Sequence, residues 1–564
     1  MRNTDQPTTP ATPPGAGSAV ARRAPGARAN IAVRVLANTW FGVGVLAALL
    51  FYAAIGSALP QVRGALEMTE MQVFRHWLFG VLVGLLFVSV LVASLARIAW
   101  NAVNAGALLT HAGLLLLVGG AFWYFATKVE GDTLLLSPRI ELRTGDGHLL
   151  PDGALLAEAG QRWAGRLPGT GELVGVEVRE ILGNATRPVV EARVRVVVGE
   201  SPARTLSLRA DDAAGVAVGR ALRLSLHVFP PVAHFYENEA PALYYRRLNE
   251  APESRRMALI DGLPIHRERY LKDGPPLRDR FDRPVPSKRT TPVGWLESWR
   301  LPIRLETPEL PFEVTIVGYL PYVAGLRRAE GSQQSGPGDG HAADGNPAPV
   351  LEPIIEPIER RRPAISPRSA SAICLKLSGR GAHAGWSERR WILFSQYPHI
   401  DPRPIHVHLP GSDEEWELIY SRRARELGAR LLAGKLSVTF FPGRMRVKAW
   451  RSDFYVQAGP GQAVQPAAVY TNQTTRVGRW TLFQSGAAPD HWSYTVLGVG
   501  NRNGIWPMLL GSILITLGSL YAFYVKPVLL RRRQRQTAMT AAPPTAGRAA
   551  ARPAREREPA EVAR

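Results

Sequence analysis

One histidine lies inside a long apolar segment, and its position points more directly to chemistry than that of any other residue. His111 belongs to Val103–Phe125, which is long enough to cross a bilayer and is otherwise nearly free of ionisable side chains. An ionisable residue is costly there, so it is expected to face protein or a cavity and to serve a function. Two roles fit: an axial ligand of haem iron, or a polar contact that joins two helices. The residue alone does not choose between them.

The other histidine groups indicate surface or packing roles. His406 and His408, in the segment HIDPRPIHVHLP, are expected on one face of a strand, with His399 close in sequence. A metal site would need a third or fourth ligand that the sequence does not place, so the pattern favours ordinary surface histidines. The same interpretation applies to His227 and His234, which flank a Phe-Pro-Pro turn.

Several function classes are excluded or disfavoured. The sequence contains no nucleotide-binding glycine loop, no Gly-x-Ser-x-Gly elbow and no His-Glu-x-x-His helix. Its one cysteine, Cys374, excludes an internal disulfide, a Cys-x-x-Cys pair and a multi-cysteine metal site. The net charge is +21, but the sequence contains no nucleic-acid-binding motif. The positive charge is therefore better explained by basic tails that contact a lipid bilayer than by binding to nucleic acid.

Four apolar segments must position His111. They predict a bundle of three transmembrane helices within residues 40–126 and a fourth helix at residues 505–525. The four segments are Trp40–Leu59, Trp77–Ala96, Val103–Phe125 and Ile505–Val525. Small residues such as Gly119 and Gly120 would let these helices pack closely.

The distribution of lysine and arginine predicts the orientation. Basic residues precede the first segment, occupy the short loop after the second and follow the fourth. They are Arg22, Arg23, Arg28, Arg34, Arg97, Lys526, Arg531, Arg532, Arg533 and Arg535. All fall on one side if the chain crosses four times, and that side is expected to be the cytoplasm. The prediction is a multi-pass protein of the cytoplasmic (inner) membrane, with both termini inside and residues 127–504 outside.

The outer region is expected to be rich in antiparallel β-structure. Segments such as ELVGVEVREIL and VVEARVRVVVGE alternate apolar and polar residues, which favours a sandwich or an open barrel. A helix is predicted near Asp413–Leu432. Flexible inserts are expected near residues 255–295 and 328–350, and the second is expected to divide the region into two β lobes. The basic tails, residues 1–30 and 526–564, are expected to be disordered.

Several motifs accompany this layout: IGSALPQ (Ile55–Gln61), THAGLLLLVGGAF around His111, KVEGD (Lys128–Asp132), VYTNQTTRVGRWTLFQSG (Val469–Gly486) and SYTVLGVGNRNG (Ser493–Gly504). Together they resemble the ResB (CcsB) family of cytochrome c biogenesis membrane proteins. The resemblance covers residues 40–132 and 440–533 and is weak between them. It departs from the family at Asn501–Gly504, where the family has Asp-Pro-Gly.

The resemblance implies a subunit of a cytochrome c synthase complex that helps move haem across the membrane for attachment to apocytochrome c. His111 would be an axial ligand of a transient haem b, opposed by a histidine of a ResC/CcsA-type membrane protein. The partner's tryptophan-rich motif is absent, so this chain would be a non-catalytic or co-catalytic subunit of the haem lyase. A thiol-reducing protein of the pathway would handle the acceptor cysteines. His491 would approach the outer membrane surface near the haem exit, unless it is an ordinary exposed histidine.

A second interpretation belongs to another class of protein. The chain would be a membrane-anchored extracytoplasmic binding, sensor or scaffold protein without haem. A membrane enzyme acting on envelope polymers is a third, but the sequence shows no paired carboxylates or nucleophile in a suitable context.

Overall fold

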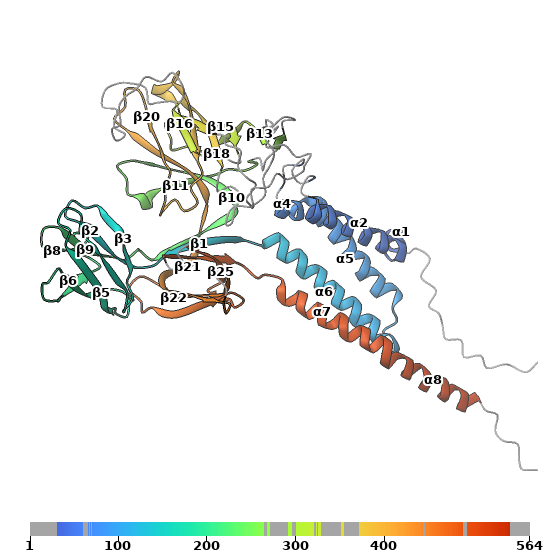
Figure 1. The fold of residues 1–564 in the computed structure, drawn as a ribbon. Helices are drawn as coiled ribbons and strands as arrows, with labels where there is room; N and C mark the ends of the chain where they lie inside the picture. The colour runs from blue at the N-terminus through green and yellow to red at the C-terminus, as the bar shows by residue number, and fades with distance from the viewer. Residues whose placement is uncertain are drawn as a thin grey trace, which may run out of the picture. The chain divides into compact units, whose positions relative to one another are not determined.

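The computed structural model describes residues 31–59, 62, 66, 68, 70–263, 268–270, 292–295, 301–320, 323, 325–328, 351–354, 371–443, 446–488 and 493–541. Two compact units make up the chain (Figure 1). One is helical and comprises Met1–Tyr52, Trp77–Phe122 and Gly504–Arg564; the other is mainly β and comprises Ala53–His76 and Trp123–Asn503. The expected combination of apolar helices with a large β region is therefore present.

Four described helices are long and apolar enough to cross a membrane. They are α2 (Thr39–Ala58), α5 (Trp77–Arg97), the segment Ala102–Thr127, which contains α6 (Ala105–Thr127), and the segment Ile505–Met539, which begins with α7 (Ile505–Leu520). A short helix α1 (Ile31–Leu36) precedes α2, the 3-10 turn η1 (Ala102–Asn104) precedes α6, and α4 (Glu70–Arg75) precedes α5. The number of helices and their order along the chain confirm the prediction.

The last helix is longer than expected. After α7 the chain forms a π-helical turn, η4 (Tyr521–Val525), and continues as α8 (Lys526–Ala541). Pro527 explains the turn, because it lacks an N–H and its ring would clash with a carbonyl four residues back in an ordinary α-helix. The prediction of a disordered tail beginning at Lys526 is therefore wrong for its first 16 residues, which form α8. The rest of that tail and residues 1–30 lie outside the described residues.

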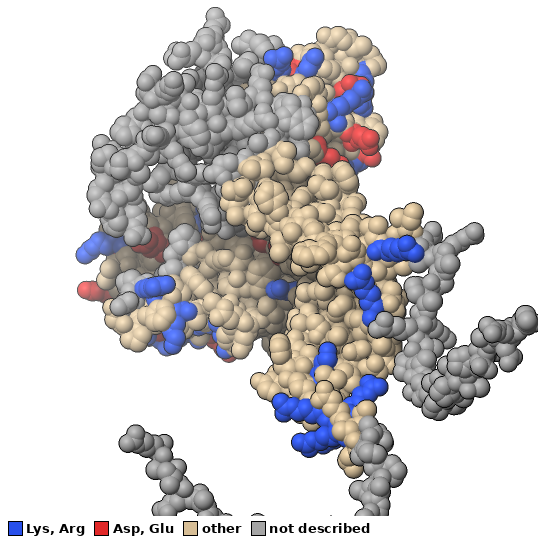
Figure 2. Space-filling model, turned by 90° about the vertical axis from the view of Figure 1, so that its right-hand side faces the viewer, with Lys and Arg blue, Asp and Glu red and all other residues tan. Residues whose placement is uncertain are grey.

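Charge is unevenly distributed over the helical unit. Its side surface is largely uncharged, and Lys and Arg gather towards one end (Figure 2). The basic residues of α8 are Lys526, Arg531, Arg532, Arg533 and Arg535. We call these five residues the basic collar. An apolar surface followed by such a group of cations is typical of a helix that leaves a bilayer on the side with anionic lipid.

The β unit is built on one ten-stranded sheet, with the order β23-β22-β21-β10-β1-β26-β25-β24 and with β11 and β20 paired to β10 and β21. The strands are β1 (Glu130–Leu136), β10 (Val232–Arg247), β11 (Arg256–Leu259), β20 (Ile405–His408), β21 (Glu415–Phe440), β22 (Val447–Gln457), β23 (Gln465–Tyr470), β24 (Thr475–Val477), β25 (Trp480–Ala487) and β26 (Tyr494–Gly500). Its strands pair antiparallel, as predicted.

Two further groups of strands add their own cores. Sheets β3-β2-β9-β8 and β4-β5-β6-β7 enclose one core, and sheet β14-β15-β18-β19 contributes to another. The strands are β2 (Arg139–Thr144), β3 (Leu149–Leu156), β4 (Arg162–Arg166), β5 (Leu173–Leu182), β6 (Glu191–Val198), β7 (Arg204–Arg209), β8 (Val216–Val218), β9 (Leu222–His227), β14 (Ile303–Leu305), β15 (Phe312–Leu320), β18 (Ala372–Gly379) and β19 (Ser387–Leu393). Two small hairpins complete the described strands: β12 (Glu268–Tyr270) with β13 (Pro292–Trp295), and β16 (Gly325–Arg328) with β17 (Leu351–Ile354).

The helix predicted at Asp413–Leu432 is wrong, because this segment forms most of strand β21. Both faces of β21 are buried near its start: Trp416 and Leu418 lie in one core, and Glu417 on the opposite face is also buried. The alternation of buried and exposed residues that marks a strand is therefore missing there. Arg, Glu, Leu and Ala favour a helix locally, but pairing with β10 over Trp416–Leu431 overrides that preference.

The insert at residues 328–350 does not separate two lobes. β15 and β18 lie on either side of it in sequence and pair antiparallel from Phe312 to Leu320. Their side chains fill one core, which includes Phe312, Ile316 and Ile373. Residues 329–350 lie outside the described residues, as do 264–267 and 271–291 of the other predicted insert.

Candidate functional site

His111 lies six residues after the start of α6 and is half-buried. Its Nδ1 is 2.8 Å from Ser94 Oγ on α5. Ser94 is buried, and its hydroxyl also lies 2.5 Å from the carbonyl oxygen of Val90, one turn earlier in the same helix. No described residue forms a hydrogen bond with the other ring nitrogen, Nε2. One nitrogen of the ring is therefore held by protein, and the other is available.

Glycine residues fix the opposite side of α6 against α7, and the two helices run side by side in Figure 1. A Cβ atom added to Gly106 would lie 2.8 Å from Gly518 O, and one added to Gly113 would lie 2.6 Å from Gly511 O. Gly120 meets Gly504 O at 2.9 Å in the same way. Real Cβ atoms do not approach so closely, so only glycine permits this contact.

These glycines form two matching repeats of seven residues that run in opposite directions. On α6 they are Gly106, Gly113 and Gly120, and their partners are Gly518, Gly511 and Gly504. Thr110 also lies on this face, since a Cβ on Gly518 would clash with its hydroxyl. The α6 backbone is thus held from one side by α7, while His111 contacts α5.

Sequence reasoning placed His111 but missed Ser94 and the glycine repeat. The repeat was readable, because the three glycines of each segment are seven residues apart in the printed sequence. Gly119 and Gly120 were expected to support close packing, and Gly120 does so, whereas Gly119 meets only the end of a Phe87 ring at 3.6 Å. Ser94 carried no comparable signal, since nothing in the sequence specifies which residue of one helix meets His111 of another.

The remaining predicted histidines that the structure describes belong to the β unit. His406 and His408 are exposed on β20 and flank buried Val407, as expected for one strand face. His406 lies 3.4 Å from Glu415, and His227 lies 3.3 Å from Glu141. Among the described residues, no three His, Cys, Asp or Glu side chains form a group that would hold a metal ion.

His399 contacts an aromatic ring instead of the other histidines. Its Nδ1 is 2.7 Å from Tyr236 Oη, and the two rings stack with centroids 5.4 Å apart. Desolvation of the ring, followed by the nearby His234 and Arg255, lowers the pKa of His399. His491 lies outside the described residues, so its predicted role stays a prediction.

The KVEGD motif supplies a structural ion pair at the start of the β unit. Asp132 accepts hydrogen bonds from Arg422 at 2.8 and 3.0 Å and from Tyr397 at 2.7 Å, and all three side chains are buried. Burial and the adjacent Asp132 carboxylate raise the pKa of Tyr397 above its ordinary range, which keeps it a donor. Gly131 cannot carry a side chain, because a Cβ would lie 2.1 Å from Tyr236 O.

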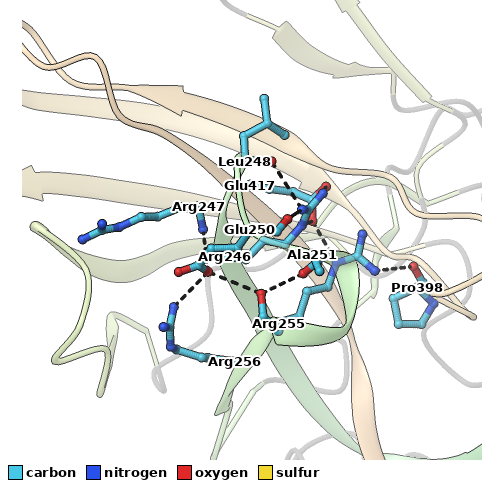
Figure 3. A network of polar contacts seen from close by, with 10 residues as sticks. Arg246, Arg247, Leu248, Glu250, Ala251, Arg255, Arg256, Pro398 and Glu417 are labelled. Carbon is cyan, nitrogen blue, oxygen red and sulfur yellow. Dashed lines mark hydrogen bonds and ion pairs between the residues drawn. The ribbon is translucent and has the colours of Figure 1, made fainter.

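A second buried carboxylate links other parts of the β unit. Glu417 of β21 accepts hydrogen bonds from Arg246 of β10 and from Arg255, each at 2.8 Å (Figure 3). Arg255 also donates to the carbonyl oxygen of Pro398 at 3.3 Å. Burial alone would raise the pKa of Glu417, but the two arginines outweigh it and hold that pKa below its ordinary value. Both ion-pair clusters are enclosed and serve the fold.

No protein family model matches the chain, and no curated protein sequence matches it. The strongest candidate site therefore stands on geometry: an imidazole within an apolar helix, restrained at Nδ1 and available at Nε2.

Proposed function

We propose that this chain is a ResB-like subunit of a cytochrome c synthase complex in the cytoplasmic membrane. It would hold haem within the membrane and help deliver it outward to apocytochrome c. The observation that supports the proposal is the state of His111: one ring nitrogen contacts Ser94, and the other has no hydrogen-bond partner among the described residues.

The donor set fits one axial position of haem iron. Imidazole nitrogen is a common iron ligand, and outer-shell hydrogen bonds to its second nitrogen orient such ligands. Within the described residues no group of three or more His, Cys, Asp or Glu side chains could hold a metal ion. The other axial ligand would come from a histidine of the ResC/CcsA-type partner, so the cargo would be held between two proteins.

The layout of the chain agrees with this role. Three apolar helices precede the β unit and one follows it, as the family resemblance leads us to expect. With the termini in the cytoplasm, the basic collar of α8 would lie inside and the β unit outside. The β unit would act as a scaffold for the partner and for apocytochrome c. Cys374 is buried, so the acceptor thiols would be handled by a separate thiol-reducing protein.

A visible absorption spectrum tests the proposal. The full chain is purified with its membrane partner in detergent, as wild type, as His111→Ala and as the control His408→Ala, which alters an exposed histidine of β20. We expect a low-spin haem spectrum in the wild type and the control. His111→Ala should lose haem, or regain the low-spin spectrum only when imidazole is added.

Two results would contradict the proposal. One is a wild-type complex that carries no haem, which would favour a membrane-anchored binding or sensor protein. The other is an unchanged haem spectrum in His111→Ala, which would make the histidine a contact between helices.

A further inference from the structure

Ser94 has a single proton, and the structure indicates where that proton goes. Its Oγ lies 2.5 Å from Val90 O, a carbonyl oxygen that can only accept a hydrogen bond. The hydroxyl proton is therefore directed to Val90, in the back-bond that serines form within helices. At the 2.8 Å contact with His111, Ser94 is then left with lone pairs alone.

This assignment fixes the tautomer of His111. Because Ser94 Oγ accepts, His111 Nδ1 must carry the hydrogen that it donates. A neutral imidazole has one N–H, so the lone pair lies on Nε2, the nitrogen without a described partner. The opposite tautomer would place two lone pairs against each other at Nδ1 and leave the N–H at Nε2 without a partner among the described residues, and a bilayer offers no water to relieve either.

The surroundings of Ser94 and His111 are held in place on both helices. Ser89 of α5 donates to Leu36 O at 2.9 Å, and Arg97 at the end of α5 donates to Thr39 Oγ1 at 3.0 Å. On α6, the glycine face towards α7 prevents rotation of the backbone that carries His111. Ser94 therefore meets His111 at a fixed place on α6.

We propose that Ser94 is a positioning residue, which holds His111 as the Nδ1–H tautomer and thereby presents the Nε2 lone pair as a ligand for haem iron. The part that concerns iron rests on the proposed function, whereas the tautomer belongs to the protein without haem. The same hydrogen bond would set the tautomer even if Ser94 and His111 only joined two helices, so the ligand role needs its own measurement of haem binding.

Nitrogen NMR of the haem-free full chain tests the tautomer directly. The protein is labelled with ¹⁵N-histidine and placed in lipid nanodiscs, and the His111 signals are identified by their loss in His111→Ala. We expect Nδ1 to be protonated and Nε2 to be unprotonated in the wild type. Ser94→Ala should yield the Nε2–H form or a mixture, and Ser94→Thr, which keeps the hydroxyl, should restore the wild-type state.

Ser89→Ala is the matched control, since it removes another buried serine hydroxyl of α5 that bonds only to backbone. Its His111 signals should equal those of the wild type. The proposal is overturned if wild-type His111 carries its proton on Nε2, or if Ser94→Ala leaves the tautomer unchanged.

The complex with the membrane partner tests the consequence for haem. Loss of an outer-shell hydrogen bond typically costs about 10–100-fold in metal affinity, so we expect a weakening of that order in Ser94→Ala and none in Ser89→Ala. Equal haem affinity in the two variants would overturn the role of Ser94 in positioning His111 for haem. A wild-type complex without haem would overturn the proposed function, and the NMR result would then decide the tautomer assignment alone.

Discussion

Gly113 of α6 and Gly511 of α7 lie with their backbones in direct contact. A Cβ atom on Gly113 would lie 2.6 Å from Gly511 O, and a Cβ on Gly511 would lie 2.5 Å from Gly113 O. The relationship is reciprocal and sits at the middle of the glycine repeat. It brings the helices close enough for weak Cα–H···O contacts, which apolar side chains would prevent.

Enlarging this contact should separate the two helices. We expect Gly113→Leu to lower the thermal stability of the detergent-solubilised protein, by an amount typical of overpacking, about 1–3 kcal/mol or more. Gly84→Leu of α5 is the control, because a Cβ there meets no atom within 4 Å. Melting followed by size-exclusion chromatography measures both. Equal midpoints for the two variants would show that the α6–α7 contact does not limit stability.

Breaking the buried pair of Asp132 and Arg422 should destabilise the β unit strongly. Asp132→Asn leaves an arginine that is only 1% exposed without its counter-charge, and removal of one partner of such a pair typically costs about 3–5 kcal/mol. Urea unfolding followed by circular dichroism measures the loss. Asp211→Asn, which alters a well-exposed pair with Arg209, should leave the midpoint unchanged. The expectation fails if both variants unfold alike.

Acid should weaken the β unit partly through Glu417. Its pKa is lowered in the folded protein, so the contribution of its ionised form is full above the unfolded-state value, near 4.5, and is lost as pH falls through the lower folded value. We expect the unfolding midpoint of the wild type to drop over this range, and Glu417→Gln to be less stable at pH 7 but flatter below it. Exposed Glu200→Gln is the control and should follow the wild type. Parallel curves for Glu417→Gln and the wild type would contradict this assignment.

The topology can be read from two single cysteines in a Cys374→Ala background. Ala99 lies exposed between α5 and α6, and Glu200 lies exposed in the β unit. An impermeant maleimide added to intact spheroplasts should label Glu200→Cys, and should label Ala99→Cys only after permeabilisation. The reverse result would place the β unit in the cytoplasm and invert the proposed orientation.

Sequence reasoning worked where one local pattern sufficed. Long apolar runs gave the helices, because a span must be about 20 residues long. Alternation gave the antiparallel strands, except in β21, where burial of Trp416 and Glu417 on opposite faces erased the pattern. The helical content of α8 was missed because its many arginines were interpreted as disorder, although arginine is a good helix former.

Only one of the two residues of the candidate site could be predicted from the sequence. His111 stood out by its own polarity, whereas Ser94 matters through a contact between two helices, which no local pattern specifies. The pairing of Asp132 with Arg422 is similar, since the two residues are 290 positions apart in the chain. Such contacts depend on which helices and strands pack against each other, and this packing cannot be predicted from local patterns in a single sequence.

The glycine repeat also has a consequence for biosynthesis. The partner of Gly120 is Gly504, and roughly 380 residues separate them in the chain. At about 5–20 residues per second, a ribosome needs on the order of 20–80 seconds to make that stretch. During that interval α6 already exists, but its glycine face has no α7 to pack against. In the proposed membrane setting, lipid or another membrane protein would cover these glycines until translation reaches α7.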